Sequence, residues 1–195
     1  MPEHPPAPNS VSAPLESQLL PDSQHLYVTW EEYHRTIEAL AVQIYRSGWE
    51  FNQIVCLAKG GLRVGDILCR LYDVPLAIVA AASYGGEQNR ERGQLVFGKN
   101  LTMTTPSLGD RVLIVDDLVD SGITLRESLV WLKSHTEVEI QEIRTAVLWY
   151  KAVSVFKPDY YVQYLEHSPW IHQPFEPYEY QTPADLARNW GTTPR

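Results

Sequence analysis

The chain has 195 residues, 44% of them hydrophobic, which is enough to bury the core of one domain. Its formal net charge of −8, with no cluster of Lys and Arg, argues against binding to nucleic acid or to an anionic membrane. No apolar run reaches the length of a membrane span, and prolines stand where a signal peptide needs an apolar stretch. The cysteines Cys56 and Cys69 lack metal-binding spacing, so we expect buried, reduced thiols and a cytoplasmic protein.

The composition and residue spacing of the N-terminal part predict a tail followed by a capped helix. Residues 1–24 are rich in Pro, Ser and Gln, a composition typical of a disordered or loosely draped segment. A short strand or an extended entry is predicted next, over 26–30, and Thr29 with Glu32 three residues later has the pattern of a capping box. The apolar spacing after it predicts a helix to about Tyr45 that packs against the core.

The next segment contains a first candidate anion site. Residues 53–58 are apolar enough for a buried strand, and Lys59-Gly60-Gly61 leads directly into a helix expected to end near Tyr72. A tight turn between a strand and a helix presents backbone N–H groups to an anion, and Lys59 adds a positive charge. Because Gly-Gly turns are common, the assignment of this turn as an anion site becomes convincing only if a second anion site lies beside it.

Another buried strand is predicted over 76–82, and a long polar segment over 83–109 follows it. Within that segment Val96 and Phe97 suit a short hairpin strand. Polar loops of this length in a compact domain are more often functional than idle, so we expect a functional loop.

The most informative stretch of the chain is 111–124. Its first part, 112–115, is an unbroken apolar run, typical of a strand buried on both faces of a parallel sheet. Asp116 and Asp117 follow at the carboxyl end of this strand, where open α/β sheets bind their ligands.

The turn after these two acids has the composition of a phosphate cradle. It contains Asp120, Ser121, Gly122 and Thr124, and the helix expected over 123–135 directs its positive end at the same place. Carboxylates beside a phosphate cradle suit a phosphorylated sugar better than a bare phosphate. The alternative is an acidic loop that only solvates the end of the strand.

Two further strands are predicted, over 142–150 and 158–165, and a short helix is expected over 183–190. Lys151 directly follows the first of these strands. It should therefore face the ligand edge of the sheet, although most lysines at strand ends are surface residues.

The segment over 167–176 contains two prolines, two aromatic residues and little periodicity, so we expect no regular element there. Trp170 has a flat ring that suits stacking on a planar base, and packing is the alternative interpretation. His167 and His172 lack a sequence signal for an acid–base partner.

The nine residues from Asp116 to Thr124 resemble the ribose-phosphate-binding signature of the type I phosphoribosyltransferases. The pattern is two acids, two apolar residues, Asp, Ser or Thr, Gly, a variable residue and Thr. The run from Trp170 to Glu176 is similar to the segment that covers the base in bacterial xanthine–guanine phosphoribosyltransferases. The resemblance, to the purine branch of the family, covers about 27–176.

This resemblance implies an α/β fold, in which a central, mostly parallel sheet is flanked by helices. A flexible loop and a small C-terminal hood at about 166–177 belong to that fold. The phosphoribosyltransferase domain then spans 25–177, and 178–195 form a C-terminal extension. Because the family is mostly dimeric or tetrameric, a homodimer or homotetramer is implied.

The resemblance also implies a reaction. The family's purine enzymes transfer a 5-phosphoribosyl group from phosphoribosyl pyrophosphate to a 6-oxopurine (guanine, xanthine or hypoxanthine), with Mg²⁺, and release pyrophosphate. By the match of motifs, Asp120 is the catalytic acid or base at the purine N7, and Asp116 and Asp117 are the Mg²⁺ ligands.

The implied ligand contacts fall into two groups. Contacts with phosphoribosyl pyrophosphate are implied for Lys59, Gly60, Arg90, Asp116, Asp117, Asp120, Ser121, Gly122, Ile123 and Thr124. Contacts with the base are implied for Lys151, Trp170 and Ile171. Arg92 is the alternative to Arg90 on the flexible loop, and the Ala58–Lys59 peptide is the candidate for a non-proline cis bond that the family often has.

Two departures from the family pattern leave the preferred base open. Lys59 stands where the xanthine–guanine enzymes usually carry Arg, and Ile123 where Gly or Lys is commoner. Two other functions compete: a non-catalytic sensor of phosphoribosyl pyrophosphate or nucleotide, and a phosphoribosyltransferase for another base. The retained Asp120 and Lys151 favour chemistry on a 6-oxopurine.

Overall fold

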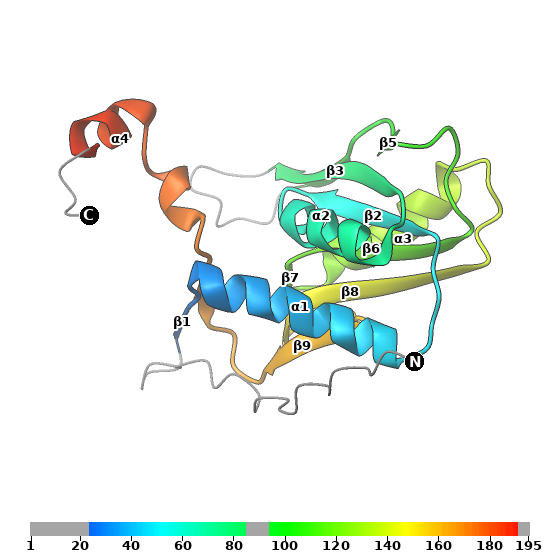
Figure 1. Cartoon of the computed structure of the whole chain (residues 1–195), viewed down its shortest axis with the longest axis horizontal. Coiled ribbons are helices and arrows are strands. Elements are labelled where there is room, and N and C mark those ends of the chain that lie inside the picture. The colour runs from blue at the N-terminus through cyan, green and yellow to red at the C-terminus, as the bar shows by residue number, and fades with distance from the viewer. Residues whose placement is uncertain (1–23, 85–93, 191–195) are drawn as a thin grey trace, which may run out of the picture.

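The computed structural model describes residues 24–84 and 94–190, which form a central sheet with helices on both faces and a small second sheet (Figure 1). The strands of the central sheet are β2 (Gln53–Ala58), β3 (Leu76–Tyr84), β4 (Gln94–Phe97), β5 (Thr102–Met103), β6 (Arg111–Val115), β7 (Leu118–Val119), β8 (Glu142–Lys151) and β9 (Tyr160–Leu165). The other elements are β1 (His25–Tyr27), α1 (Trp30–Arg46), α2 (Gly61–Tyr72), α3 (Ile123–Ser134), β10 (Trp170–His172), the 3₁₀ helix η1 (Glu176–Glu179) and α4 (Pro183–Asn189).

The main strands of the central sheet are parallel. β3, β2, β6 and β8 lie in that order, β7 continues the line of β6 along β8, and β9 lies on the other side of β8. β4 and β5 both pair antiparallel with β3 at the edge of the sheet. The carboxyl ends of β2, β6 and β8 therefore meet at one edge, as parallel strands joined by helices require.

The core has two parts, one on each face of the sheet. Ile37 of α1 and Leu68 of α2 pack with Leu113 of β6 on one face, and Leu125 of α3 packs with Ile114 on the other. In Figure 1, α1 and α2 lie in front of the sheet. Alternate residues of the same strands thus enter different core clusters, which is why the strand sequences are apolar without interruption.

The two cysteines are free thiols, Cys56 fully buried and Cys69 partly exposed. Burial raises the pKa of the Cys56 thiol to about 12, so it behaves as a small apolar core residue. Within the described ranges, no helix is both long and apolar enough to cross a lipid bilayer.

The predicted start of α1 is confirmed. The Thr29 side chain accepts from the backbone N–H of Glu32 at 3.2 Å, and the Glu32 carboxylate accepts from the backbone N–H of Thr29 at 2.8 Å. The helix then buries Tyr33, Ile37 and other residues of its apolar face against the sheet.

Gly61, the first residue of α2, lies directly against the backbone of β6. A Cβ atom at this position would collide with the carbonyl oxygen of Val115 and lie 3.2 Å from the Cα of Asp116. We therefore expect Gly61→Ala to lower the free energy of unfolding by about 1–3 kcal/mol, because backbone cannot move aside as a side chain can. Gly98→Ala is the control, since its nearest contact would be an ordinary 3.5 Å from Ala80. Equal urea midpoints for the two variants would contradict this packing.

The sequence-based expectation of no regular element over 167–176 is wrong. β10 forms there and pairs in parallel with β1, with His25 opposite Trp170 and Tyr27 opposite His172. The pairing is extended by hydrogen bonds from Trp170 N to Gln24 O (2.7 Å) and from Val28 N to His172 O (3.1 Å). The hood therefore contains a strand from each end of the domain.

The polar segment over 83–109 is also more ordered than expected. β3 continues to Tyr84, beyond the predicted limit at 82, and the predicted hairpin strand is confirmed as β4. β5 was not predicted. Residues 85–93 of this segment and the tail over 1–23 lie outside the described residues.

Candidate active site

Two adjacent carboxylates stand at the carboxyl end of β6. The backbone N–H of Asp117 donates to Asp116 Oδ1 at 2.9 Å, and the Asp117 carbonyl accepts from the N–H groups of Leu148 (3.0 Å) and Trp149 (3.1 Å). Burial and the neighbouring Asp117 raise the pKa of Asp116 well above its ordinary value, and burial also raises that of Asp117. A cation at this point would relieve the repulsion between the two groups.

The turn after β2 lies directly against these acids. A Cβ atom on Gly60 would collide with Asp117 Oδ1 and lie 2.6 Å from Asp116 Oδ1, so any larger residue would push the two carboxylates out of their present positions. The Ala58–Lys59 peptide bond before it is cis, as the family resemblance implied. The two segments identified separately in the sequence are thus neighbours in space.

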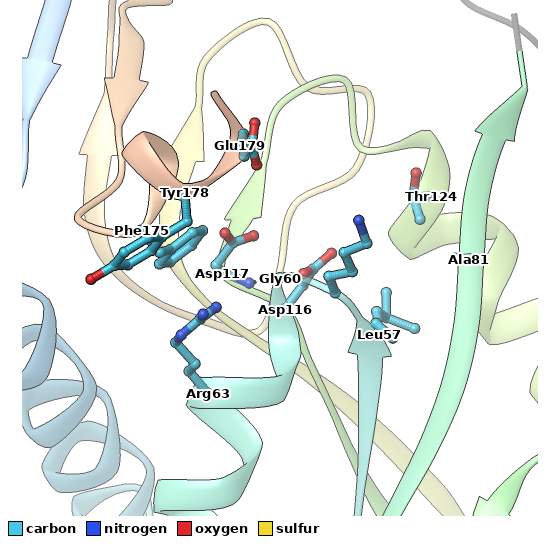
Figure 2. Close-up of a pocket in the computed structure, with 12 residues that line it drawn as sticks. Leu57, Gly60, Arg63, Ala81, Asp116, Asp117, Thr124, Phe175, Tyr178 and Glu179 are labelled. Carbon is cyan, nitrogen blue, oxygen red and sulfur yellow. Dashed lines mark hydrogen bonds between the residues drawn. The ribbon is translucent and has the colours of Figure 1, made fainter. Parts of the chain in front are cut away.

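A cavity of about 480 Å³ opens above this contact (Figure 2). Its walls come from the β2 turn, the acidic pair, the start of α3 and the hood. The lining residues are Leu57, Ala58, Lys59, Gly60, Arg63, Ala81, Asp116, Asp117, Thr124, Phe175, Tyr178 and Glu179. A pocket that combines two cations with adjacent carboxylates suits an anion held together with a metal ion.

Arg63 is a cavity residue that the sequence analysis missed. It belongs to the first turn of α2, and in Figure 2 its side chain extends toward Asp117 and the ring of Phe175. Its guanidinium carbon lies 4.1 Å from the centre of the Phe175 ring, and its charge lowers the pKa of Asp117 against the effect of burial. Its position four residues after Lys59, at the start of the helix, is the signal that would have found it.

The family resemblance implies phosphoribosyl pyrophosphate as the ligand, so we expect Arg63→Ala to weaken its binding about tenfold or more, since charged hydrogen bonds to phosphate are strong. Isothermal titration calorimetry measures this directly. Arg70→Ala, on the same helix but paired with Asp66 on the surface, is the matched control and should bind as the wild type does. Unchanged affinity in Arg63→Ala would remove Arg63 from the anion site.

The predicted phosphate turn forms as a tight loop before α3. Gly122 has φ +78°, and a Cβ there would collide with Ser154 Oγ and lie 2.8 Å from Phe156 N. Ser121 is held through its carbonyl, which accepts from Val155 N at 3.0 Å. Ile123 and Thr124 begin α3, so their backbone N–H groups lie at the positive end of that helix.

A second cavity, of about 600 Å³, is bordered by Asp120, the residue just before this turn. It is lined by Gln24, His25, Asp120, Lys151, His167, Ser168, Pro169 and Trp170. The Lys151 side chain is only 6% exposed, and its Nζ lies 3.5 Å from Asp120 Oδ1. Lys151 is thus buried beside a carboxylate at the cavity wall, unlike the usual lysine at a strand end, which is a surface residue.

The structure brings most of the residues predicted for the site to these two cavities. Trp170 is 59% exposed and borders the second cavity, whereas the side chain of Ile171 is buried in the core. Arg90 and Arg92 lie outside the described residues.

The hood supplies further groups that the sequence analysis missed. The side-chain amide of Gln173 donates to Asp117 Oδ2 at 2.9 Å, and its buried Oε1 has no hydrogen-bond partner among the residues that the structure describes. Tyr178 and Glu179, in the segment predicted as a C-terminal extension, line the first cavity. His172, for which the sequence carries no signal of an acid–base partner, has one in the structure, because its Nδ1 lies 2.7 Å from Glu176 Oε2.

Comparison with known proteins decides the family. The family described as "Phosphoribosyl transferase domain" matches residues 29–181. The chain belongs to this family. The prediction of a type I phosphoribosyltransferase with an α/β fold is therefore confirmed.

Individual phosphoribosyltransferases agree with this assignment. The chain is 36% identical over 104 residues to a xanthine-guanine phosphoribosyltransferase of Gluconobacter oxydans, a match that covers 51% of this chain and 58% of that protein. It is 27% identical over 155 residues to that of Idiomarina loihiensis, covering 79% and 88%. A purine phosphoribosyltransferase structure from Pyrococcus horikoshii superposes with a TM-score of 0.59 and 31% identity, over 78% of this chain and 94% of that one.

Proposed function

We propose that the protein transfers the 5-phosphoribosyl group of phosphoribosyl pyrophosphate to a 6-oxopurine and releases pyrophosphate. The observation that carries this proposal is that one segment, 116–124, lines both cavities. Asp116, Asp117 and Thr124 face the anion-binding cavity, and Asp120 faces the cavity with Lys151 and Trp170. Two substrates bound on either side of this segment would meet at its middle. The relatives named as xanthine-guanine and purine phosphoribosyltransferases support the same reaction.

In this proposal the first cavity holds the pyrophosphate end of the substrate. Lys59 and Arg63 supply positive charge, and the Gly60 turn brings backbone close to the ligand. The turn from Ser121 to Thr124 holds the 5′-phosphate at the start of α3. Arg90 is a further proposed pyrophosphate contact from the loop.

The acidic pair fits Mg²⁺. This ion prefers oxygen ligands and is commonly held by one or two carboxylates together with substrate phosphates and water. Asp116 and Asp117 would hold it; burial is the main cause of the raised pKa of both carboxyls, and a bound cation would favour their ionised form. When bound, Mg²⁺ neutralises charge that develops on the leaving pyrophosphate.

The second cavity holds the purine. Trp170 offers an exposed ring for stacking, and Lys151 is a hydrogen-bond donor for the purine O6. Asp120 accepts or returns the N7 proton as the purine nitrogen attacks the ribose carbon. The Asp120 carboxylate lies 3.5 Å from the positively charged Lys151 ammonium, which favours its ionised form.

Other properties stay predictions. They are the choice among guanine, xanthine and hypoxanthine, assembly as a homodimer or homotetramer, a cytoplasmic location and the domain limits at 25–177.

The proposal is tested by offering the purified protein phosphoribosyl pyrophosphate, Mg²⁺ and one base at a time. Guanine, xanthine, hypoxanthine, adenine and uracil are compared, and nucleotide formation is followed by absorbance. Turnover of at least one 6-oxopurine, with adenine and uracil inert, is the expected result. Binding of phosphoribosyl pyrophosphate without turnover of any base would overturn the enzymatic function in favour of a sensor.

A further inference from the structure

A chain of polar side chains runs through the hood to the wall of the second cavity. The Glu176 carboxylate accepts from Trp170 Nε1 at 2.9 Å through one oxygen and faces His172 Nδ1 at 2.7 Å through the other. His172 Nε2 lies 2.9 Å from His25 Nδ1. Among these residues His25 and Trp170 line the cavity. His25, just before the short strand or extended entry predicted over 26–30, therefore contributes to the wall of the second cavity.

The row of hydrogen-bonded side chains Glu176, His172 and His25 determines which nitrogen of each imidazole ring carries the hydrogen. An ionised carboxylate only accepts, so His172 Nδ1 must donate to Glu176. The Nε2 of a neutral His172 is then an acceptor, and His25 Nδ1 must donate to it. In a neutral His25 this leaves Nε2 as an acceptor, and it is the ring nitrogen left for a ligand.

The surrounding structure holds both rings in place. The Tyr27 and His172 rings stack with centroids 4.2 Å apart and planes 8° apart. The pairing of β1 with β10 sets His25 opposite Trp170, and the His172 and Glu176 side chains are only 25% and 17% exposed. An acceptor on a rigid support discriminates between ligands better than one on a mobile side chain.

The second cavity thus combines a donor with an acceptor. The ammonium of Lys151 only donates, whereas His25 in this tautomer accepts. Guanine and hypoxanthine both carry the O6 that suits Lys151, but guanine alone has a 2-amino group to donate.

We propose that His25 is a specificity-determining residue that accepts a hydrogen bond from the 2-amino group of guanine and so favours guanine over hypoxanthine. The proposal rests on the proposed function of the second cavity as a 6-oxopurine site. His172 and Glu176 are positioning residues, which act by setting the tautomer of His25.

The test compares kcat and KM for guanine and hypoxanthine at pH 8, above the ordinary histidine range. His25→Leu is expected to raise KM for guanine about five- to tenfold, the size of one hydrogen bond, with kcat and the values for hypoxanthine within about twofold. His172→Phe, which keeps a ring against Tyr27 but removes the hydrogen bonds to Glu176 and His25, should shift the guanine preference in the same direction. His25→Gln, which keeps an acceptor, should restore part of it. His135→Leu, at the far end of α3, is the remote control.

Calorimetric titration with guanosine and inosine monophosphates separates this proposal from the reaction itself. Weaker binding of guanosine monophosphate alone in His25→Leu would support the role of His25 even if the protein turned over no base. An equal loss for both nucleotides, or no loss for either, would overturn it, as would a His172→Phe variant with the wild-type preference.

Discussion

Asp120→Asn is expected to lower kcat about 100- to 10,000-fold, because the amide cannot take up the proton that a carboxylate general base handles. The change preserves size, and Asp120 is largely exposed, so the protein should still fold, at some cost in stability because Lys151 loses its charged partner. The substitution also leaves the buried Lys151 ammonium without a charged partner that now lies 3.5 Å from it. Steady-state kinetics with saturating phosphoribosyl pyrophosphate would measure the effect.

A surface aspartate serves as the control for this substitution. Asp66 pairs with Arg70 on the exposed side of α2, so Asp66→Asn should retain wild-type kcat. If Asp120→Asn kept kcat within threefold of wild type, Asp120 would not be the catalytic group. A change in KM for the base with unchanged kcat would reduce its role to binding.

Asp116→Asn is expected to lower activity about 100-fold or more and yet to stabilise the ligand-free protein. Activity falls because the pair would lose half of its charge for Mg²⁺. Stability rises because the cost of burying a charged group and the repulsion from Asp117 both disappear, and an amide Oδ1 still accepts from the backbone N–H of Asp117. Similar relief of a strained functional site commonly raises Tm by about 2–6 °C.

The stabilisation has a definite pH dependence. The pKa of Asp116 is higher in the folded protein than in the unfolded chain, so the folded state binds more protons between the two values. Wild-type stability therefore falls as pH rises through the folded pKa, and asparagine removes this loss. In EDTA, the Tm advantage of Asp116→Asn should be small near pH 4 and grow toward pH 8. An advantage that is constant with pH would contradict the raised pKa.

Sequence reasoning located the site best where the signal is local. The acids and the phosphate turn lie within nine residues that directly follow β6 and include the start of α3, so one segment fixes their arrangement. The Lys59 turn was found for the same reason, since a strand and a helix enclose it. Both parts could be placed at one sheet edge because parallel strands share their carboxyl ends.

The hood was predicted poorly because its contacts are distant in the sequence. β1 and β10 have three residues each, too few for a periodic pattern, and each strand forms only because the other is present. The hydrogen bond between His25 and His172 joins positions 147 residues apart. Nothing in the local sequence of either histidine indicates a partner at that separation.

The most direct test of the whole account is a crystal structure of the protein with guanosine monophosphate. The 5′-phosphate is expected on the turn from Ser121 to Thr124, and the purine beside Trp170 with O6 within hydrogen-bond distance of Lys151 Nζ. A nucleotide bound with its base among Lys59, Arg63 and Phe175, or outside both cavities, would contradict the assignment of the two cavities and the chemistry built on it.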